Sequence, residues 1–356
     1  ARRALCSSLR MVKMGTPFSR VSRKCGSPPC PNFWIRTGSQ PLLGVDLSAM
    51  TFATHLFPLK AFAALALAGA CAGAAWAQPA AEAPVVLQQV ELPLPSGAVL
   101  RAHWWPAPQP SVHATASAQP AVLALHGCGG LYAKAGVLSS RYRETAETLH
   151  AAGYAVLMPD SFGSRGLRDV CQTRYSDRSL NVNDRVQDAR AALVWLAAQP
   201  GVDARHIGVM GWSNGGTTTL NLLVQRHTHP QEGEPPLAGA AVFYPGCGPL
   251  LKHQAVAESV PLLMQLGALD DWTPAQPCVD WACTLKARAG SDVTVHVYEG
   301  SYHGFDGKEP VRLRGDVPNG TSAHGVHQGG NPTARVQSLA SLQSFWKRVL
   351  GTPTAP

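Results

Sequence analysis

The run GWSNGG at residues 211–216 constrains the fold of this chain more than any other feature. It follows an apolar, strand-like segment, Ile207–Met210, and precedes a helix-like one, Thr217–Val224. A serine between small residues on such a strand-to-helix turn has a strained backbone, and its hydroxyl lies exposed above the end of a sheet. The free N–H groups at the start of the helix favour a negatively charged oxygen at the same point. The run therefore predicts an α/β sheet with Ser213 at the carboxyl end of a strand.

The region after residue 77 alternates strand-like and helix-like segments. After a hairpin formed by Val85–Leu92 and Ala98–Trp105, apolar strands are predicted at Ala121–Leu125, Ala155–Pro159, Ile207–Met210, Ala238–Phe243, Leu262–Leu266 and Val293–Tyr298. Helices are predicted at Tyr142–Ala152, Asp184–Ala198, Thr217–Val224, Ala275–Ala289 and Thr333–Leu350. Apolar strands separated by helices form a mostly parallel sheet covered by helices on both faces. We therefore predict one α/β domain over residues 78–356.

Two polar residues that follow later strands complete a candidate nucleophilic site with Ser213. A serine hydroxyl is a weak nucleophile until a base takes its proton, and the base needs an acid to orient it. Asp270 follows one predicted strand, with Asp271 as the alternative acid, and His303 follows the next strand. The order serine, acid, histidine is the one that α/β sheets with a nucleophilic serine use.

The glycine-rich turn His126–Gly130 follows an earlier strand and is a candidate oxyanion hole. Such a hole needs one backbone N–H from the residue after the nucleophile and a second from a turn after an earlier strand. We expect Asn214 and Cys128 to supply these two donors. The alternative is a glycine-rich turn without a catalytic role. A phosphate site is excluded, because the turn lacks a Gly-Lys-Ser/Thr ending.

Several segments together resemble the dienelactone hydrolase family of α/β-hydrolases. They are LHGCGG, GYAVLMPDSFGSRG, DARHIGVMGWSNGG, LGALDDWTPA and YEGSYHGFD, within residues 121–305. The resemblance implies the α/β-hydrolase fold, a small ester or lactone as substrate, no metal or organic cofactor, and a monomer or weak homodimer. It also implies Ser213, Asp270 and His303 as a catalytic triad. The namesake enzymes use a cysteine nucleophile, so Ser213 indicates the wider esterase-like branch, and we do not expect dienelactone itself as the substrate.

Three further side chains are candidates for substrate binding. Tyr132 and Trp212 are predicted to line the pocket. Arg165 is a candidate ligand for a substrate carboxylate, because a guanidinium binds a carboxylate through two parallel hydrogen bonds. The alternative is that Arg165 pairs with Asp160 or Asp188 and fixes its own loop.

The long connection 306–331 follows the candidate base and is expected to form a rim over the site. Its His324 and His327 have the spacing of metal ligands, but they lie in a glycine-rich loop without a clear third ligand. We therefore predict no metal site.

Residues 1–77 carry the whole positive charge of the chain. They hold nine Lys or Arg residues against one acid, Asp46, whereas the formal net charge of the full chain is +8. The remaining residues are therefore neutral overall, which argues against a nucleic-acid partner.

A secretory signal is predicted at residues 50–77. Its apolar run Ala61–Ala70 precedes an A-x-A cleavage pattern at residues 75–77 and is too short for a stable bilayer span. We expect cleavage before Gln78, no membrane anchor afterwards, and a periplasmic or secreted protein. Residues 1–49 precede this signal without periodicity, and we interpret them as a disordered, non-native upstream extension.

Five cysteines follow the predicted cleavage site. Export places them in an oxidising compartment, which favours disulfides, and their odd number leaves one thiol free or paired between chains. We expect Cys128–Cys171 near the oxyanion turn and Cys247–Cys278 after two later strands, with Cys283 free.

Together these features predict an exported serine hydrolase that cleaves a small carboxylic ester or lactone through an acyl-enzyme. A peptidase or thioesterase with the same triad is an alternative, because acyl chemistry alone does not choose the leaving group. A non-catalytic binding protein on the same scaffold is a second alternative, which a complete triad argues against.

Overall fold

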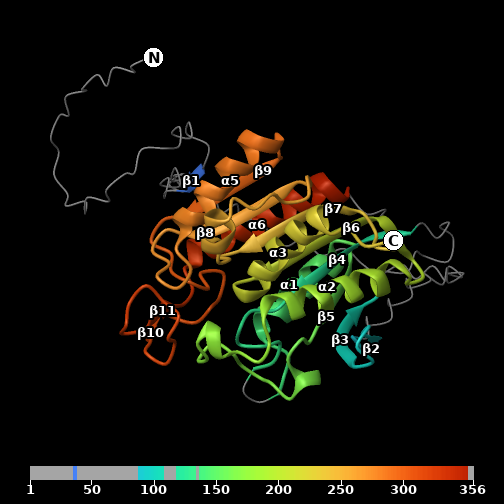
Figure 1. The fold of residues 1–356 in the computed structure, drawn as a ribbon, viewed down its shortest axis with the longest axis horizontal. Coiled ribbons are helices and arrows are strands. Elements are labelled where there is room, and N and C mark those ends of the chain that lie inside the picture. The colour runs from blue at the N-terminus through green and yellow to red at the C-terminus, as the bar shows by residue number, and fades with distance from the viewer. Residues whose placement is uncertain (1–34, 38–86, 108–117, 134–135, 352–356) are drawn as a thin grey trace, which may run out of the picture. The chain divides into compact units, whose positions relative to one another are not determined.

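The computed structural model describes residues 35–37, 87–107, 118–133 and 136–351 of the chain. Within them, a nine-stranded sheet carries helices on both faces (Figure 1). The strands of this sheet are β1 (Ile35–Thr37), β2 (Gln88–Pro93), β3 (Val99–Trp105), β4 (Gln119–Leu125), β5 (Ala155–Pro159), β6 (Val202–Trp212), β7 (Leu237–Phe243), β8 (Leu262–Gly267) and β9 (Val293–Tyr298). The α-helices are α1 (Ser140–Ala151), α2 (Val182–Ala197), α3 (Asn214–Thr228), α4 (Gly248–Lys252), α5 (Ala275–Ala289) and α6 (Pro332–Leu350).

The sheet is parallel except at one edge. Its strand order is β1-β9-β8-β7-β6-β4-β5-β3-β2, and only the pairings β2–β3 and β3–β5 are antiparallel. Every residue of the central strands β4 and β5 is buried, as expected where helices cover both faces. The predicted α/β fold with a mostly parallel sheet is thus confirmed.

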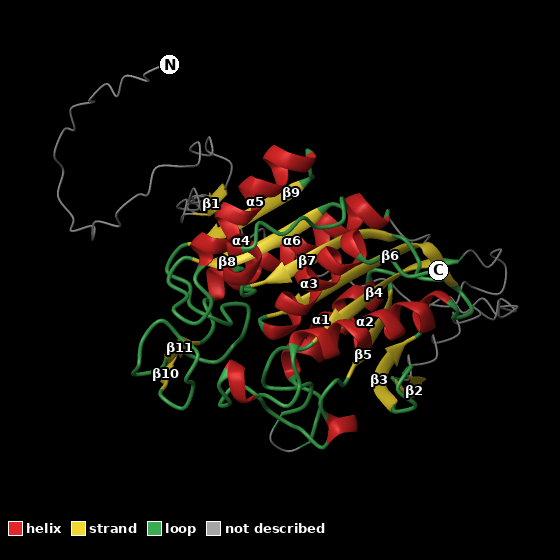
Figure 2. Cartoon of the chain, viewed as in Figure 1, coloured by secondary structure: helices red, strands yellow, loops and turns green. Residues whose placement is uncertain are grey.

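Two apolar cores hold the helices to the sheet. Helices α1 and α6 pack on one face, where Trp346 and Leu149 are buried, and α2, α3 and α5 pack on the other, around Leu193, Leu220 and Trp281 (Figure 2). Burying one large apolar side chain contributes about 1.5–3 kcal/mol, whereas an exposed ion pair contributes about 0–1 kcal/mol. The two cores therefore dominate the stability of the domain.

Most predicted elements lie within a few residues of the observed ones. The strand before Ser213 is longer than predicted, because β6 begins at Val202, and α3 begins at Asn214, directly after the serine. The connection 306–331 was predicted without strands, yet it contains the antiparallel pair β10 (Arg312–Arg314) and β11 (Val326–Gln328). The short helix α4 was not predicted either.

Strand β1 comes from residues 1–49 and pairs in parallel with β9. The other residues of that segment, and the predicted signal at residues 50–77, lie outside the described residues. Among the helices of the described ranges, none is both long and apolar enough to cross a bilayer.

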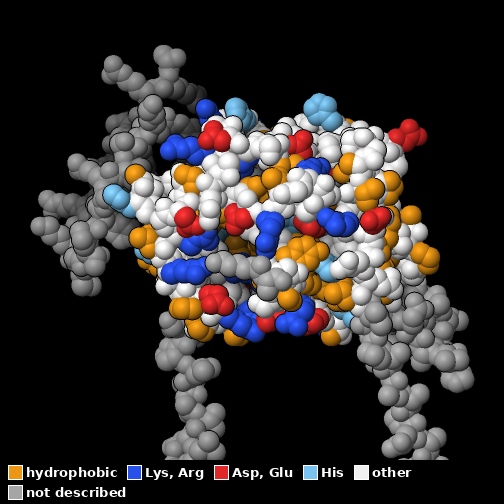
Figure 3. Space-filling view, turned by 90° about the horizontal axis from the view of Figure 1, so that it is seen from below, with side chains coloured by type: hydrophobic (Ala, Val, Ile, Leu, Met, Phe, Trp, Pro, Cys, Tyr) orange, Lys and Arg blue, Asp and Glu red, His pale blue; other side chains and the backbone are white. Residues whose placement is uncertain are grey.

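The surface seen in Figure 3 mixes charges of both signs. Basic and acidic side chains alternate there and do not gather by sign. A nucleic-acid site needs clustered basic side chains, so this face lacks the electrostatic footprint of one.

Gly208 in β6 tests the close packing of α6 on the sheet. A Cβ at this position would lie 2.5 Å from Cζ3 of Trp346, whose side chain is fully buried. We expect Gly208→Ala to lower the free energy of unfolding by about 1–3 kcal/mol, because overpacking outweighs the ~0.4–1 kcal/mol that alanine gains by restricting the unfolded chain. Urea unfolding measures the change.

The control is Gly248→Ala, where an added Cβ meets no atom within 4 Å. Equal changes in the free energy of unfolding for the two variants would contradict the close contact between Gly208 and Trp346 of α6.

Candidate active site

Ser213 lies on a sharp turn between β6 and α3. Its backbone has φ 52° and ψ −116°, in the positive-φ region that residues other than glycine rarely adopt. The turn brings α3 against β4, where a Cβ on Gly215 would lie 2.0 Å from the carbonyl oxygen of Leu125. A Cβ on Gly211 would lie 2.4 Å from the backbone of Gly215. The glycines of the run are therefore a steric requirement of the turn that presents Ser213.

Ser213, His303 and Asp270 form one continuous chain of hydrogen bonds. Nε2 of His303 lies 2.9 Å from Oγ of Ser213, and Nδ1 of His303 lies 2.9 Å from Oδ2 of Asp270. The histidine ring packs against two tilted aromatic rings, with its centroid 4.5 Å from that of Trp272 and 4.6 Å from that of Tyr244. The three predicted residues thus meet at the carboxyl ends of β6, β8 and β9, although they lie far apart in sequence.

The Asp270 carboxylate is held by hydrogen bonds from its own loop. Its Oδ1 accepts from the backbone N–H groups of Trp272 (2.9 Å) and Thr273 (2.8 Å), and the Thr273 hydroxyl lies 3.1 Å from Oδ2. Asp271 turns away and pairs instead with Nδ1 of His327 at 2.7 Å. Of the two acids left open by the sequence, Asp270 is the one that contacts His303.

Cys128 and Asn214 both lie beside Ser213. Both line one cavity with it, and within the described residues neither backbone N–H donates a hydrogen bond to the protein. The turn that carries Cys128 is fixed by a disulfide to Cys171, by the 2.9 Å bond from the N–H of Gly127 to the hydroxyl of Tyr142, and by burial. The predicted donors are therefore free and rigidly placed next to the serine.

A buried arginine, absent from the sequence-based site, contacts Asn214. Nη1 of Arg185 in α2 donates to Oδ1 of Asn214 at 2.5 Å, and the guanidinium lies 5.3 Å from the centroid of the Phe162 ring. Only 2% of the residue is exposed, and burial lowers the pKa of Arg185 to about 10, which leaves it charged at neutral pH. A positive charge thus lies behind the first turn of α3.

Arg165 fixes its own loop. Its guanidinium makes two hydrogen bonds to Asp188, at 2.9 and 2.8 Å, and a third to the carbonyl of Ser161 at 2.7 Å. The pair with Asp188 was the alternative to substrate binding, and the structure favours it.

Tyr132 and Trp212 both line the cavity at Ser213, but Trp212 is the more deeply buried of the two. Tyr132 lines a cavity with Ser213, and its hydroxyl lies 3.0 Å from Nε2 of His103. The backbone of Trp212 precedes the serine, but its residue is only 1% exposed, and its indole N–H donates to Oδ2 of Asp306 at 2.9 Å. Trp212 nevertheless lines the same cavity as Tyr132 and Ser213, so its predicted place in the pocket wall agrees with the structure, and its hydrogen bond to Asp306 anchors it there.

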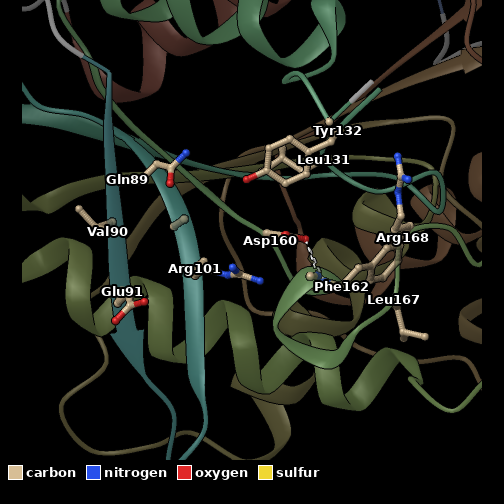
Figure 4. Close-up of a pocket in the computed structure, with 13 residues that line it drawn as sticks. Gln89, Val90, Glu91, Arg101, Leu131, Tyr132, Asp160, Phe162, Leu167 and Arg168 are labelled. Carbon is tan, nitrogen blue, oxygen red and sulfur yellow. Dashed lines mark hydrogen bonds between the residues drawn. The ribbon is translucent and has the colours of Figure 1, made fainter. Parts of the chain in front are cut away.

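Two cavities meet at Ser213. The larger, about 500 Å³, and the smaller, about 170 Å³, share Ser213, Cys128 and Trp272. A third cavity of about 590 Å³ lies between β2, β3 and the loop after β5, and Figure 4 shows Tyr132 and Arg101 pointing into it. It contains none of the three hydrogen-bonded residues, so the first two cavities form the candidate active site.

Both predicted disulfides are present. Cys128 bonds to Cys171, and Cys247 bonds to Cys278. Cys283 is disulfide-bonded as well, so the prediction that it is free is wrong.

The fold and this site define a protein of the α/β-hydrolase class. The family model of the dienelactone hydrolase family matches residues 110–348, about two thirds of the sequence. The chain therefore belongs to the dienelactone hydrolase family, a family of carboxylic ester hydrolases.

Solved structures share the fold at low identity, and a curated relative matches part of the sequence. A protein of Klebsiella pneumoniae described as a dienelactone hydrolase has a TM-score of 0.53 at 15% identity, covering 74% of this chain and 98% of that one. Esterase 2 of Thermogutta terrifontis has a TM-score of 0.52 at 19% identity, covering 76% and 94%. An uncharacterized protein of Mycobacterium tuberculosis is 33% identical over 175 residues, and the match spans 46% of this chain and 57% of that protein.

Substitution of Arg165 tests whether this residue stabilises its loop or binds a substrate carboxylate. The side chain of Asp188 is 1% exposed, so Arg165→Gln leaves a buried carboxylate without its partner. We expect the free energy of unfolding to fall by about 2–3 kcal/mol, less than the 3–5 kcal/mol of a fully buried pair because the arginine side chain is 29% exposed. Chemical denaturation measures this loss.

The matched control is Arg205→Gln, which breaks an exposed pair with Asp203 and should cost at most about 1 kcal/mol. Unchanged stability of Arg165→Gln together with a raised KM would restore the substrate-binding role.

Proposed function

We propose that this chain is an exported serine hydrolase that cleaves a small carboxylic ester or lactone. The observation that carries the proposal is the hydrogen-bond chain from Asp270 through His303 to Ser213, in a member of an ester-hydrolase family. In this assignment Ser213 is the nucleophile, His303 the base and Asp270 the orienting acid.

The proposed reaction follows from the positions of these groups. As the Oγ of Ser213 attacks the carbonyl carbon, its proton passes to Nε2 of His303, and Asp270 stabilises the resulting imidazolium. The N–H groups of Asn214 and Cys128 bind the oxyanion of the tetrahedral intermediate. His303 then protonates the leaving oxygen, the carbonyl–oxygen bond breaks, and water deprotonated by His303 hydrolyses the acyl-enzyme.

The buried charge of Arg185 supports the same assignment. It holds the side chain of Asn214, and it adds a positive potential behind the proposed oxyanion donors. Charges in a dry protein interior act more strongly than charges in water. The arrangement therefore favours negative charge at Ser213, as acyl transfer requires.

Disulfides support export. Cys128–Cys171 and Cys247–Cys278 border the candidate site, and disulfides persist in oxidising compartments such as the periplasm. Together with the predicted signal at residues 50–77, they favour a periplasmic or secreted enzyme.

The nucleophile is tested by substitution and by labelling. We expect Ser213→Ala to lower kcat for p-nitrophenyl esters by at least about 10³-fold, because the covalent step is lost. Paraoxon phosphorylates esterase 2 of Thermogutta terrifontis, and we expect it to modify Ser213 in the wild type only. Peptide mass spectrometry locates the label.

Ester turnover by Ser213→Ala at the wild-type rate would refute the proposed nucleophile. Labelling of Ser213 without turnover of any oxygen ester, but with turnover of a peptide or thioester, would favour the alternative leaving groups.

The acid is tested by two adjacent substitutions. Asp270→Asn should lower kcat by about 10³–10⁴-fold, because the amide no longer holds the histidine in its productive tautomer. Asp271→Asn should retain activity near that of the wild type, since Asp271 contacts His327 and not His303. Steady-state kinetics of both variants measure the difference, and the reverse ranking would overturn the assignment.

A further inference from the structure

The two cavities that meet at Ser213 differ in which proposed catalytic groups line them. Asn214, a proposed oxyanion donor, lines the larger cavity, whereas His303 lines only the smaller one. The proton that His303 donates must reach the leaving oxygen, so the leaving alcohol has to lie within hydrogen-bond reach of its Nε2. The smaller cavity is therefore the alcohol lobe, and the larger cavity is the acyl lobe.

Apolar side chains dominate the acyl lobe. Its apolar lining residues are Leu180, Val182, Pro249, Pro277 and Trp272. Arg178 also lines this lobe, where its guanidinium lies 4.4 Å from the centroid of the Tyr175 ring and its Nε donates to the carbonyl of Thr173 at 3.2 Å. Its volume of about 500 Å³ lies within the range of about 300–1,000 Å³ that holds small organic ligands and far exceeds what an acetyl group fills. This lobe fits an apolar acyl group of several carbons.

Polar groups of both kinds line the alcohol lobe. The β10–β11 pair contributes Arg314 and Gln328, and the loop before Cys171 contributes Asp169. Nη1 of Arg314 donates to Oε1 of Gln328 at 2.9 Å, which leaves the amide Nε2 of Gln328 as a free donor among the described residues. Oδ1 of Asp169 accepts from the N–H of Cys171, and its Oδ2 accepts no hydrogen bond from the described residues, although the carboxylate attracts the charges of Arg178 and Arg314.

The cations of this lobe are already neutralised. Arg314 is paired through Nε and Nη2 with Asp316, at 2.7 and 2.8 Å, and Arg141 lies 3.4 Å from Asp306. A site for an anionic alcohol would keep a guanidinium free for it. Free donors and acceptors side by side instead suit hydroxyl groups, which both donate and accept.

Gln328 has a fixed place beside the proposed proton donor. It forms a β-bridge with His303, and the N–H of the next residue, Gly329, donates to the carbonyl of His303 at 3.0 Å. The lobe holds about 170 Å³, roughly the volume of six liquid water molecules, which suits a small polyol.

From this division we infer that the substrate is an ester between an apolar carboxylic acid larger than acetic acid and a neutral, polyhydroxylated alcohol. Gln328 is then a specificity residue for the alcohol. The inference rests on the proposed function, because it uses the direction of proton transfer from His303.

The experiment compares matched esters with the purified chain. The substrates are the glyceryl, n-butyl and phosphoglyceryl esters of 3-phenylpropanoic acid, together with glyceryl acetate. We expect kcat/KM of the glyceryl phenylpropanoate to exceed that of the butyl ester and of glyceryl acetate by at least about tenfold each, since each comparison removes more than one favourable contact.

Substitution of Gln328 tests its role in this preference. Gln328→Leu should reduce the glyceryl-over-butyl ratio by about three- to tenfold, the effect of one lost hydrogen bond to a hydroxyl. Gln328→Glu keeps an acceptor for Arg314 and removes the amide donor, so it should reduce the ratio without loss of folding. The control Gln276→Leu changes an exposed amide outside both lobes and should leave the ratio unchanged.

Each outcome decides a separate question. Equal kcat/KM for the butyl and glyceryl esters, or a preference for the phosphoglyceryl ester, overturns the inference while the ester hydrolase stands. Turnover of none of these esters, together with no labelling of Ser213 by paraoxon, refutes the proposed function itself.

Discussion

The close approach of α3 to β4 is the constraint on which the candidate site depends. Gly215 lies so near the backbone of Leu125 that no side chain fits between them, and Ser213 takes its positive φ as a consequence. This contact places the start of α3 beside the glycine-rich turn after β4, so the N–H groups of Asn214 and Cys128 flank one serine. The strain at Ser213 persists because both flanking elements are buried in the sheet and its cores.

Buried charge surrounds this turn on two sides. Arg185 contacts Asn214 from α2, and Asp306 accepts hydrogen bonds from Trp212 and Tyr244 beneath the serine. An uncompensated buried charge is costly. Asp306 is compensated by these hydrogen bonds and by Arg141, whereas Arg185 has one hydrogen bond and the ring of Phe162, and its Nε and Nη2 have no hydrogen-bond partner among the described residues. We interpret both as supports that hold the site's polar groups in place within an apolar environment.

The sequence could predict the parts of the site that obey simple positional rules. Ser213, Asp270 and His303 each follow an apolar strand, and the carboxyl ends of parallel strands share one edge of the sheet. Whether Asp270 or Asp271 is the acid depends on which carboxylate accepts hydrogen bonds from the backbone N–H groups of Trp272 and Thr273. The loop geometry decides this, and the sequence does not show it. The sequence offers one signal for a functional role of Arg185, which is a charged residue on the buried, alanine-rich face of α2. Strands β10 and β11 escaped prediction because each has only three residues.

The β10–β11 segment is tied to both loops that carry the proposed acid and base. The N–H of Thr321 donates to the carbonyl of Asp271 at 2.9 Å, and Gly329 donates to His303 at 3.0 Å. Few apolar side chains of this segment are buried, Val317 and Val326 among them, so these polar contacts account for much of its attachment. The segment that lines the alcohol lobe is thus also the one that covers the base, and any movement of it would change alcohol recognition and the surroundings of His303 together.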